Sequence, residues 1–375
     1  MPVSYRKIQH FNECDNLFRT NFCLQVKASP GYPKRVLSGI QPTGSLHLGN
    51  YLGAIKKWVH LQDSGDEAFY SIADLHAITV PQDPRNLRTG ILEMTASLLA
   101  CGIDPEKCVL FQQSKVLYHT QLCWVLASFT TMAKLGQQAQ LREKREILQE
   151  LSTALYLYPV LQAADILLYK ATHVPVGEDQ ISHLNLASFI ARGFNKRFGD
   201  TFPIPHPFIN EDSSRRLKSL RNPLSKMSKS DNDPRSRINL CDSPEEILLK
   251  CKKAVTDCSS AVEYDPEKRP GISNLLVIHS SLTGKTIDTI CQEAAGMETG
   301  NYKITMATEI IEVLRPIRER FHELIKEPAY LEDVLETGAS RASACARETW
   351  QEVSKRIGID TSLRDERKKA FHSQN

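Results

Sequence analysis

Hydrophobic and polar positions alternate along the first half of the chain in patterns that predict strands separated by helices. Short apolar runs with the length of buried strands occupy 36–40, 68–73, 108–111 and 173–176. Apolar residues recur at helical spacing after 47–50 and over 86–100, 120–133 and 178–192. This alternation predicts an α/β fold in which helices cover both faces of a parallel sheet.

The pattern changes to helical spacing alone in the last third of the chain. The segment 243–246, Ser-Pro-Glu-Glu, supplies a capping serine, a proline at the first helical position and a glutamate that can cap back. It predicts a helix running towards Val255. Apolar residues then recur at helical spacing over 304–335. A helical bundle is therefore expected here, with lysines and arginines that face either RNA phosphates or only solvent.

Composition excludes some classes of protein and leaves others open. The chain has 375 residues, 41% hydrophobic and 24% charged, which fits roughly two globular domains. Its net charge of +3 is slight, so any RNA contact must come from a local basic face. No apolar run approaches the roughly twenty residues of a membrane span, so no membrane association is expected. The ten cysteines are scattered without a C-x-x-C pair, which favours buried free thiols over disulfides or a metal site.

The stretch 36–50 predicts an anion site. A buried strand is followed by the turn 42–44 and by the start of a helix, whose free N–H groups and dipole favour a phosphate. Gly49 lets a ligand approach the backbone, and His47 and Asn50 add side-chain donors.

A second candidate is the segment 226–230, Lys-Met-Ser-Lys-Ser. Pro223 and Pro234 disfavour a continuous helix through it, so a mobile loop is expected. Lys226 and Lys229 are point charges that suit a polyphosphate. Taken alone, the segment is better explained as a solvated basic loop, and the stretch 36–50 is what favours the phosphate site.

Together the two segments resemble the paired signatures of class I aminoacyl-tRNA synthetases, and most closely those of bacterial and mitochondrial tryptophanyl-tRNA synthetases. Further matching motifs run in family order from about residue 35 to the C-terminal helices. They are 38–44, 74–80, 158–169, 174–180, 194–199, 226–230 and 270–276.

The resemblance implies a domain plan. A Rossmann-like, doubly wound catalytic domain is expected over 35–215, the mobile signature loop over 216–235, and an α-helical domain that binds the tRNA anticodon over 236–375. A homodimer is also implied, with one tRNA spanning both subunits.

The segment 1–34 lies before the region of resemblance. The first 35 residues hold six lysines or arginines against only Glu13 and Asp15. A basic, acid-poor leader suits a mitochondrial transit peptide and hence the mitochondrial matrix. A disordered tail on a cytoplasmic protein is the alternative.

The reaction implied by the resemblance has two steps. L-Tryptophan and ATP give tryptophanyl-adenylate and pyrophosphate, and the tryptophanyl group then passes to the 3′ end of tRNA-Trp. The substrate carboxylate is already a nucleophile, so the site has to position two anions and stabilise the leaving pyrophosphate with lysines, helix amides and Mg²⁺.

The resemblance assigns Lys226, Lys229 and His47 the catalytic roles. The expected ATP-binding residues are Gln41, His47, Leu48, Gly49, Asn50, Gly177, Glu178, Asp179, Leu217, Lys226, Met227, Ser228, Lys229 and Ser230.

Asp165 is the candidate for recognising the indole N–H. It lies in an apolar context, where an uncompensated carboxylate is costly, although helix capping or an internal ion pair also explains it. The other expected tryptophan-binding residues are Gly39, His76, Tyr158, Val174 and Val176. Leu37 and Gln162 depart from the phenylalanine and methionine of bacterial relatives, while Gln140 and Lys144 fall at substrate-facing positions of the family.

Three alternatives remain at this stage. A tyrosyl-tRNA synthetase shares the fold and the reaction, but Asp165 and the 74–76 motif point away from it. A synthetase-like RNA-binding protein without catalysis is disfavoured by the intact lysines. An unrelated nucleotidyltransferase with a similar phosphate loop is the third.

Overall fold

The computed structural model describes residues 31–138, 152–177, 180–208, 217–229 and 231–361. Five parallel strands form one sheet in the order β3-β2-β1-β4-β5. Their bounds are β1 Arg35–Ile40, β2 Glu67–Ile72, β3 Val109–Gln112, β4 His173–Pro175 and β5 His206–Phe208. Strand β1 lies at the centre, with Arg35 opposite Glu67 and Ile40 opposite Ile72. The four predicted strands and the parallel α/β fold are therefore confirmed.

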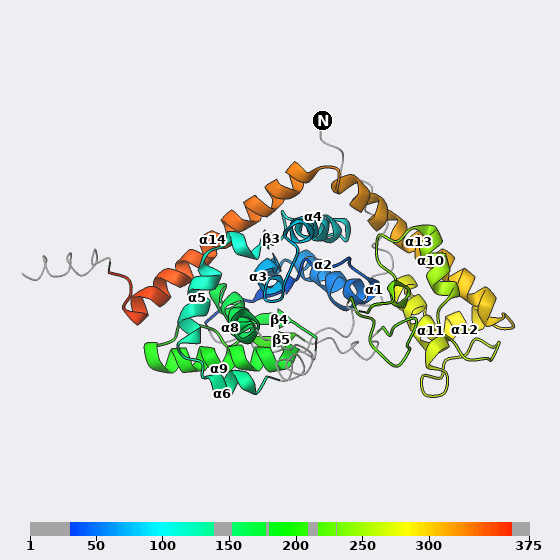
Figure 1. The fold of residues 1–375 in the computed structure, drawn as a ribbon, viewed down its shortest axis with the longest axis horizontal. Coiled ribbons are helices and arrows are strands. Elements are labelled where there is room, and N and C mark those ends of the chain that lie inside the picture. Colours follow the sequence, from blue (N-terminus) through cyan, green and yellow to red (C-terminus); the bar gives the residue numbers. More distant parts are fainter. Residues whose placement is uncertain (1–30, 139–151, 178–179, 209–216, 230, 362–375) are drawn as a thin grey trace, which may run out of the picture.

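Helices cover both faces of the sheet (Figure 1). The helical segments of this part are α1 Leu48–Asn50, the π-helical η2 Tyr51–Ile55, α2 Lys56–Asp63, α3 Asp74–Ala77, α4 Pro84–Ala100, η3 Gln113–Lys115, α5 Tyr118–Ala127, α6 Met132–Gly136, α8 Thr153–Leu168 and α9 Ile181–Phe198. Successive residues of β1 face opposite sides, as its pleat requires. Val36 joins the core formed with α2 and α4, while Leu37 joins the core formed with α5, α8 and α9.

The second part of the chain is helical, as predicted. Its segments are η6 Pro234–Ser236, α10 Pro244–Lys252, α11 Pro270–Thr283, α12 Ile287–Glu293, α13 Thr299–Leu324 and α14 Pro328–Ile357. Ser243 and Glu246 form the predicted capping box of α10, which ends at Lys252, before the expected Val255. Among the described residues, no helix combines the length and the apolar character that crossing a bilayer requires.

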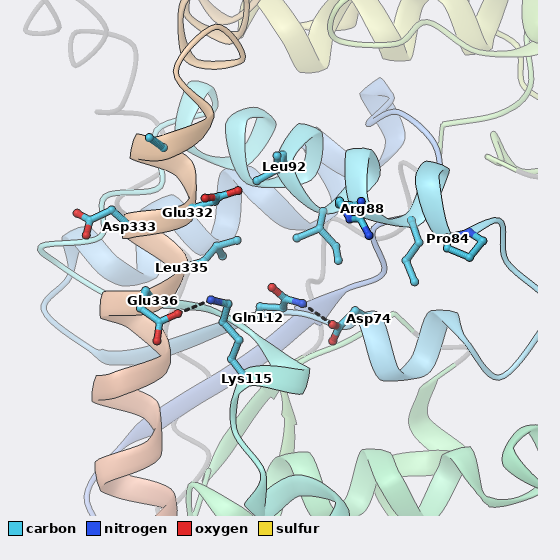
Figure 2. Close-up of a pocket in the computed structure, with 13 residues that line it drawn as sticks. Asp74, Pro84, Arg88, Leu92, Gln112, Lys115, Glu332, Asp333, Leu335 and Glu336 are labelled. Atoms are coloured by element: carbon cyan, nitrogen blue, oxygen red, sulfur yellow. Dashed lines mark hydrogen bonds and ion pairs between the residues drawn. The ribbon is translucent and has the colours of Figure 1, made fainter.

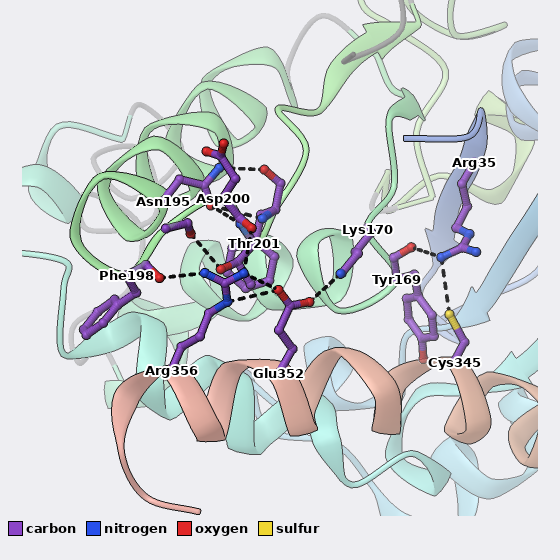
Figure 3. A network of polar contacts seen from close by, with 12 residues as sticks. Arg35, Tyr169, Lys170, Asn195, Phe198, Asp200, Thr201, Cys345, Glu352 and Arg356 are labelled. Atoms are coloured by element: carbon purple, nitrogen blue, oxygen red, sulfur yellow. Dashed lines mark hydrogen bonds and ion pairs between the residues drawn. The ribbon is translucent and has the colours of Figure 1, made fainter. Parts of the chain in front are cut away.

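The two longest helices join the helical part to the sheet. Figure 1 shows α13 and α14 meeting at a sharp angle, with α14 returning towards α5 and β3. Gly338 permits the contact with β3, because a Cβ there would lie 1.7 Å from the carbonyl oxygen of Leu110. Polar contacts fasten the far end of α14 (Figure 3): Glu352 accepts from Lys170 at 2.7 Å, and Arg356 donates to the carbonyl oxygen of Phe198.

Two predicted helices differ in their bounds. The helix expected over 120–133 is two helices, because α5 ends at Ala127 and Thr131 caps α6 with its side chain. The helix expected over 178–192 begins at Ile181 and continues to Phe198, where Gly199 ends it with φ 89°.

Candidate active site

The predicted anion site forms where β1 leads through its turn into the helical run that starts at Leu48. His47 precedes this run, and its backbone N–H donates to the Asn50 side chain at 3.2 Å. Gly49 lies against the His47 ring, which a Cβ on Gly49 would approach to 2.9 Å. Leu48 is fully buried and donates its N–H to the carbonyl oxygen of Ile238 at 2.9 Å, so it supports the site from the core.

The lysine loop packs against this turn. The ammonium group of Lys229 lies 3.3 Å from the carbonyl oxygen of Thr43 and 3.5 Å from that of Gly44. Met227 is buried, and its N–H donates to the carbonyl oxygen of Leu217 at 3.0 Å. The structure thus brings together two segments that are about 180 residues apart in the sequence.

Positive charge converges at this point. Burial first, and then the charges of Lys229, Arg237 and Lys226, lower the pKa of His47 to about 4. Burial lowers the pKa of Lys229 to about 8. The Nδ1 atom of His47 is buried without a hydrogen-bond partner among the described residues. Because cations that crowd one another are stabilised by a bound anion, the arrangement suits a polyphosphate.

Asp165, on α8, is the centre of a second cluster. Its Oδ2 lies 2.7 Å from Nε2 of His76, and its Oδ1 lies 2.7 Å from Nδ1 of His119. Gln113 donates its Nε2–H to the same Oδ1 at 2.8 Å. His119 in turn lies 2.8 Å from the hydroxyl of Tyr169.

These contacts determine the charge of Asp165. Burial by itself raises the pKa of this carboxyl, but the hydrogen bonds and charges of His119 and His76 outweigh it, and the pKa lies well below its ordinary value. The carboxylate is therefore ionised. It offers about four lone-pair sites, of which three are used: two on Oδ1 and one on Oδ2. One acceptor site on Oδ2 has no partner among the described residues.

The other predicted pocket residues lie on neighbouring elements. The ring of Tyr158 meets that of His76 edge to face at 6.5 Å, and its hydroxyl lies 3.0 Å from Nε2 of His183. Gln162, one turn before Asp165, donates to Gln180 at 3.4 Å. Val174 is buried in β4, and Val176 follows that strand half-buried.

The backbone at the carboxyl ends of β1 and β4 is open. Gly39, Gln41 and Gly177 are exposed there, and a Cβ on Gly39 would meet the Ser71 hydroxyl at 2.6 Å. This is the edge where ligands of parallel sheets bind. Lys226 is also exposed, and Ser228 is half-buried.

Some predicted residues lie outside the described part of the chain. They are Glu178, Asp179, Ser230, Gln140 and Lys144.

Sequence reasoning missed Gln113, His119 and Tyr169. Gln113 had one available signal, since it lies two residues after the predicted strand 108–111, at the edge where ligands bind. Tyr169 also had a signal, since it ends the family motif 158–169. His119 had none, because a single polar residue in an apolar helix is usually structural.

A cleft of about 760 Å³ lies between α4 and α14 (Figure 2). Asp74 lines it and accepts from Gln112 at 2.7 Å and from the N–H of Ser114 at 3.0 Å. Since His76 is in the same short helix as Asp74, these bonds hold α3 and the end of β3 together. They thereby keep His76 and Gln113 beside Asp165.

Comparison with known proteins agrees with this geometry. The family described as tRNA synthetases class I (W and Y) matches residues 30–315. Tryptophan–tRNA ligase 2 of Streptomyces avermitilis is 46% identical over 87% of this chain and 97% of its own length. The tryptophan–tRNA ligase of Caldanaerobacter subterraneus is 46% identical over 87% of this chain and 98% of its own.

A solved structure gives the same result. The tryptophanyl-tRNA synthetase of Campylobacter jejuni, complexed with ADP and tryptophan, has a TM-score of 0.77 and 34% identity, covering 86% of this chain and 99% of that one. This chain therefore belongs to the tryptophan–tRNA ligase family of the class I tRNA synthetases.

Proposed function

We propose that this protein is a tryptophan–tRNA ligase, which activates L-tryptophan with ATP and transfers it to the 3′ end of tRNA-Trp. The observation that carries the proposal is Asp165, a buried, ionised carboxylate that accepts from His76, His119 and Gln113 and has one acceptor site left. An indole offers one N–H donor on an apolar body, and that acceptor suits it. A pocket built to hydrogen-bond a substrate group discriminates strongly against ligands that lack it.

In the first step the tryptophan carboxylate attacks the α-phosphate of ATP, and pyrophosphate leaves. Lys226 and Lys229 hold the β- and γ-phosphates, where negative charge grows, and Ser228 and Ser230 add hydroxyl donors. His47, Gly49 and Asn50 meet the phosphates at the start of the helix. The half-buried position of Lys229, beside the turn after β1, supports this role.

The remaining nucleotide contacts are proposed from the positions of their residues. Gln41 and Gly177 lie open at the sheet edge, where the ribose and adenine of ATP would bind together with Glu178 and Asp179. Leu217 and Met227 form the apolar floor beneath the adenine.

Mg²⁺ fits this site as a companion of ATP. The described residues contain no group of three or more His, Cys, Asp or Glu side chains able to hold a metal ion. Mg²⁺ commonly keeps several waters and binds through substrate phosphates, whose charge it neutralises. The ion would accordingly be held by phosphate oxygens beside Lys226 and Lys229.

Binding of the tRNA anticodon is assigned to the region 236–375. We propose a homodimer in which one tRNA spans both subunits. Leu117 and Trp124 support it, because Leu117 caps α5, Trp124 lies seven residues further along the same face, and they are 72% and 77% exposed. Large apolar side chains left exposed on one face mark an interaction surface.

The mitochondrial matrix remains the proposed location, from the basic segment 1–34 alone. The relatives named above are bacterial and give it no support.

The test is tryptophan-dependent exchange of pyrophosphate into ATP by Asp165→Asn and Lys226→Ala. We expect at least a tenfold loss in each, since a hydrogen bond to a charged group contributes about 1.5–3 kcal/mol. Asp242→Asn is the control, a buried aspartate paired with Lys250 in the helical part. It should leave the KM for tryptophan unchanged. Unimpaired exchange in Asp165→Asn would remove the basis of the proposal.

A further inference from the structure

His119 and Tyr169 lie behind Asp165, where no substrate can touch them. Both are fully buried. Their rings are enclosed by Phe69 and Phe111: Phe111 stacks on His119 with centroids 5.9 Å apart, and Phe69 stacks on Tyr169 at 4.8 Å. The rings therefore have little freedom to turn.

The charge of Asp165 fixes the direction of the hydrogen bond that it shares with His119. Because the ionised Asp165 only accepts, Nδ1 of His119 must carry a proton and donate to Oδ1 at 2.7 Å. The Nε2 atom of the same ring lies 2.8 Å from the hydroxyl of Tyr169; when the ring is neutral, Nε2 is an acceptor and the hydroxyl donates to it. Burial first, and then the charge of Asp165, raise the pKa of Tyr169 well above its usual value, so its proton stays in place.

The direction of these bonds matters for the acceptor site that faces the substrate. His119 and Gln113 together fill both lone-pair sites of Oδ1, and His76 fills one on Oδ2. If the bond from His119 were lost, one site on Oδ1 would open, the carboxylate would have two open sites instead of one, and it could rotate. The single acceptor would then no longer point in one direction.

We propose that His119 and Tyr169 are positioning residues, which fix the orientation of the Asp165 carboxylate. They thereby set the selectivity of the pocket for a ligand that carries an N–H donor. The inference rests on the proposed role of Asp165 in reading the indole. It assigns part of substrate selectivity to side chains that never contact the substrate.

The experiment compares tryptophan with β-(benzothiophen-3-yl)alanine, in which sulfur replaces the indole N–H. For each variant, kcat/KM in pyrophosphate exchange is measured with both amino acids, and their ratio reports how well the N–H is read. A general loss of structure lowers both values together and leaves the ratio unchanged.

Two variants of His119 separate the two nitrogens of its ring, and a third variant removes the hydroxyl of Tyr169. In His119→Asn the amide nitrogen lies near the place of Nδ1 and still donates to Asp165, whereas in His119→Gln it reaches the place of Nε2. We expect His119→Gln to lower the ratio about tenfold through a higher KM for tryptophan, and His119→Asn to retain most of it. Tyr169→Phe should lower the ratio severalfold.

Tyr302→Phe is the matched control. Tyr302 is also buried, and its hydroxyl also contacts a histidine, Nδ1 of His279 at 3.2 Å, but in the helical part. Its ratio should equal that of the unmodified protein.

The outcomes distinguish the two proposals. A ratio that collapses in Asp165→Asn but is unchanged in His119→Gln would overturn this inference and leave the proposed function standing. A ratio unchanged in Asp165→Asn itself would overturn the proposed function.

Discussion

Lys229 gives the proposed ATP site a dependence on pH that can be separated from every other titration. Burial lowers its pKa to about 8, whereas an arginine at this position stays charged at any working pH. The experiment raises the pH from 7 to 9 and compares ATP affinity in the unmodified protein and in Lys229→Arg. A bound polyphosphate favours the charged ammonium, so binding raises the pKa of Lys229. ATP affinity must therefore fall as pH rises through 8.

The size of the effect follows from the pKa of the free protein. With a pKa of about 8, roughly nine-tenths of Lys229 is charged at pH 7 and roughly one-tenth at pH 9. If only the charged form grips the phosphates, affinity falls by up to about tenfold over this range. His47, with a pKa of about 4, does not titrate between pH 7 and 9 and adds nothing.

The assay is calorimetric titration of ATP with Mg²⁺ at pH 7, 8 and 9. Titration of the nucleotide itself is common to both proteins, so the ratio of their dissociation constants isolates Lys229. Lys285→Arg is the control, since the hydrogen bond to Glu293 raises the pKa of Lys285 and keeps it charged. Parallel pH profiles for the unmodified protein and Lys229→Arg would refute the reasoning.

Three further predictions concern the fold, the assembly and the location. Gly338→Ala should lower the free energy of unfolding, measured with denaturant, by about 1–3 kcal/mol, because the added methyl group meets the β3 backbone. The control Gly193→Ala, which has no neighbouring atom within 4 Å in α9, should raise it by up to about 1 kcal/mol. Equal unfolding midpoints for the two variants would contradict the packing of α14. Trp124→Glu should shift the protein from dimer to monomer in sedimentation, and a dimer of undiminished affinity would place the interface elsewhere. Residues 1–34 fused to a fluorescent protein should direct it to mitochondria, and a diffuse cytoplasmic signal would refute the leader.

Sequence alone predicted the elements whose patterns are local. The strand 36–40 and the capping box of α10 depend on neighbouring residues, and both are confirmed. The local pattern does not predict helix α8, because this helix is apolar on most sides and contains Pro159, so it shows no amphipathic period. The sequence does not predict strand β5 either, because it has only three residues and Pro207 is one of them. The return of α14 to β3 joins residues more than 200 positions apart, and no local pattern encodes it.

The same distinction applies to the site. Asp165 and His76 were predicted because they lie in motifs, and the structure joins them at 2.7 Å. The other partners of Asp165 come from η3 and α5, and each looks like an ordinary polar residue in its own segment. Their shared contact with Asp165 becomes visible only in the folded structure, where the sheet brings these segments together.

The central claim is that this protein activates tryptophan. The measurement that tests it most directly is ATP–pyrophosphate exchange by the purified, unmodified protein with tryptophan, with tyrosine and with no amino acid. The account predicts exchange with tryptophan and none above background with tyrosine. Exchange with tyrosine alone, or no exchange with any amino acid by the folded protein, would contradict it.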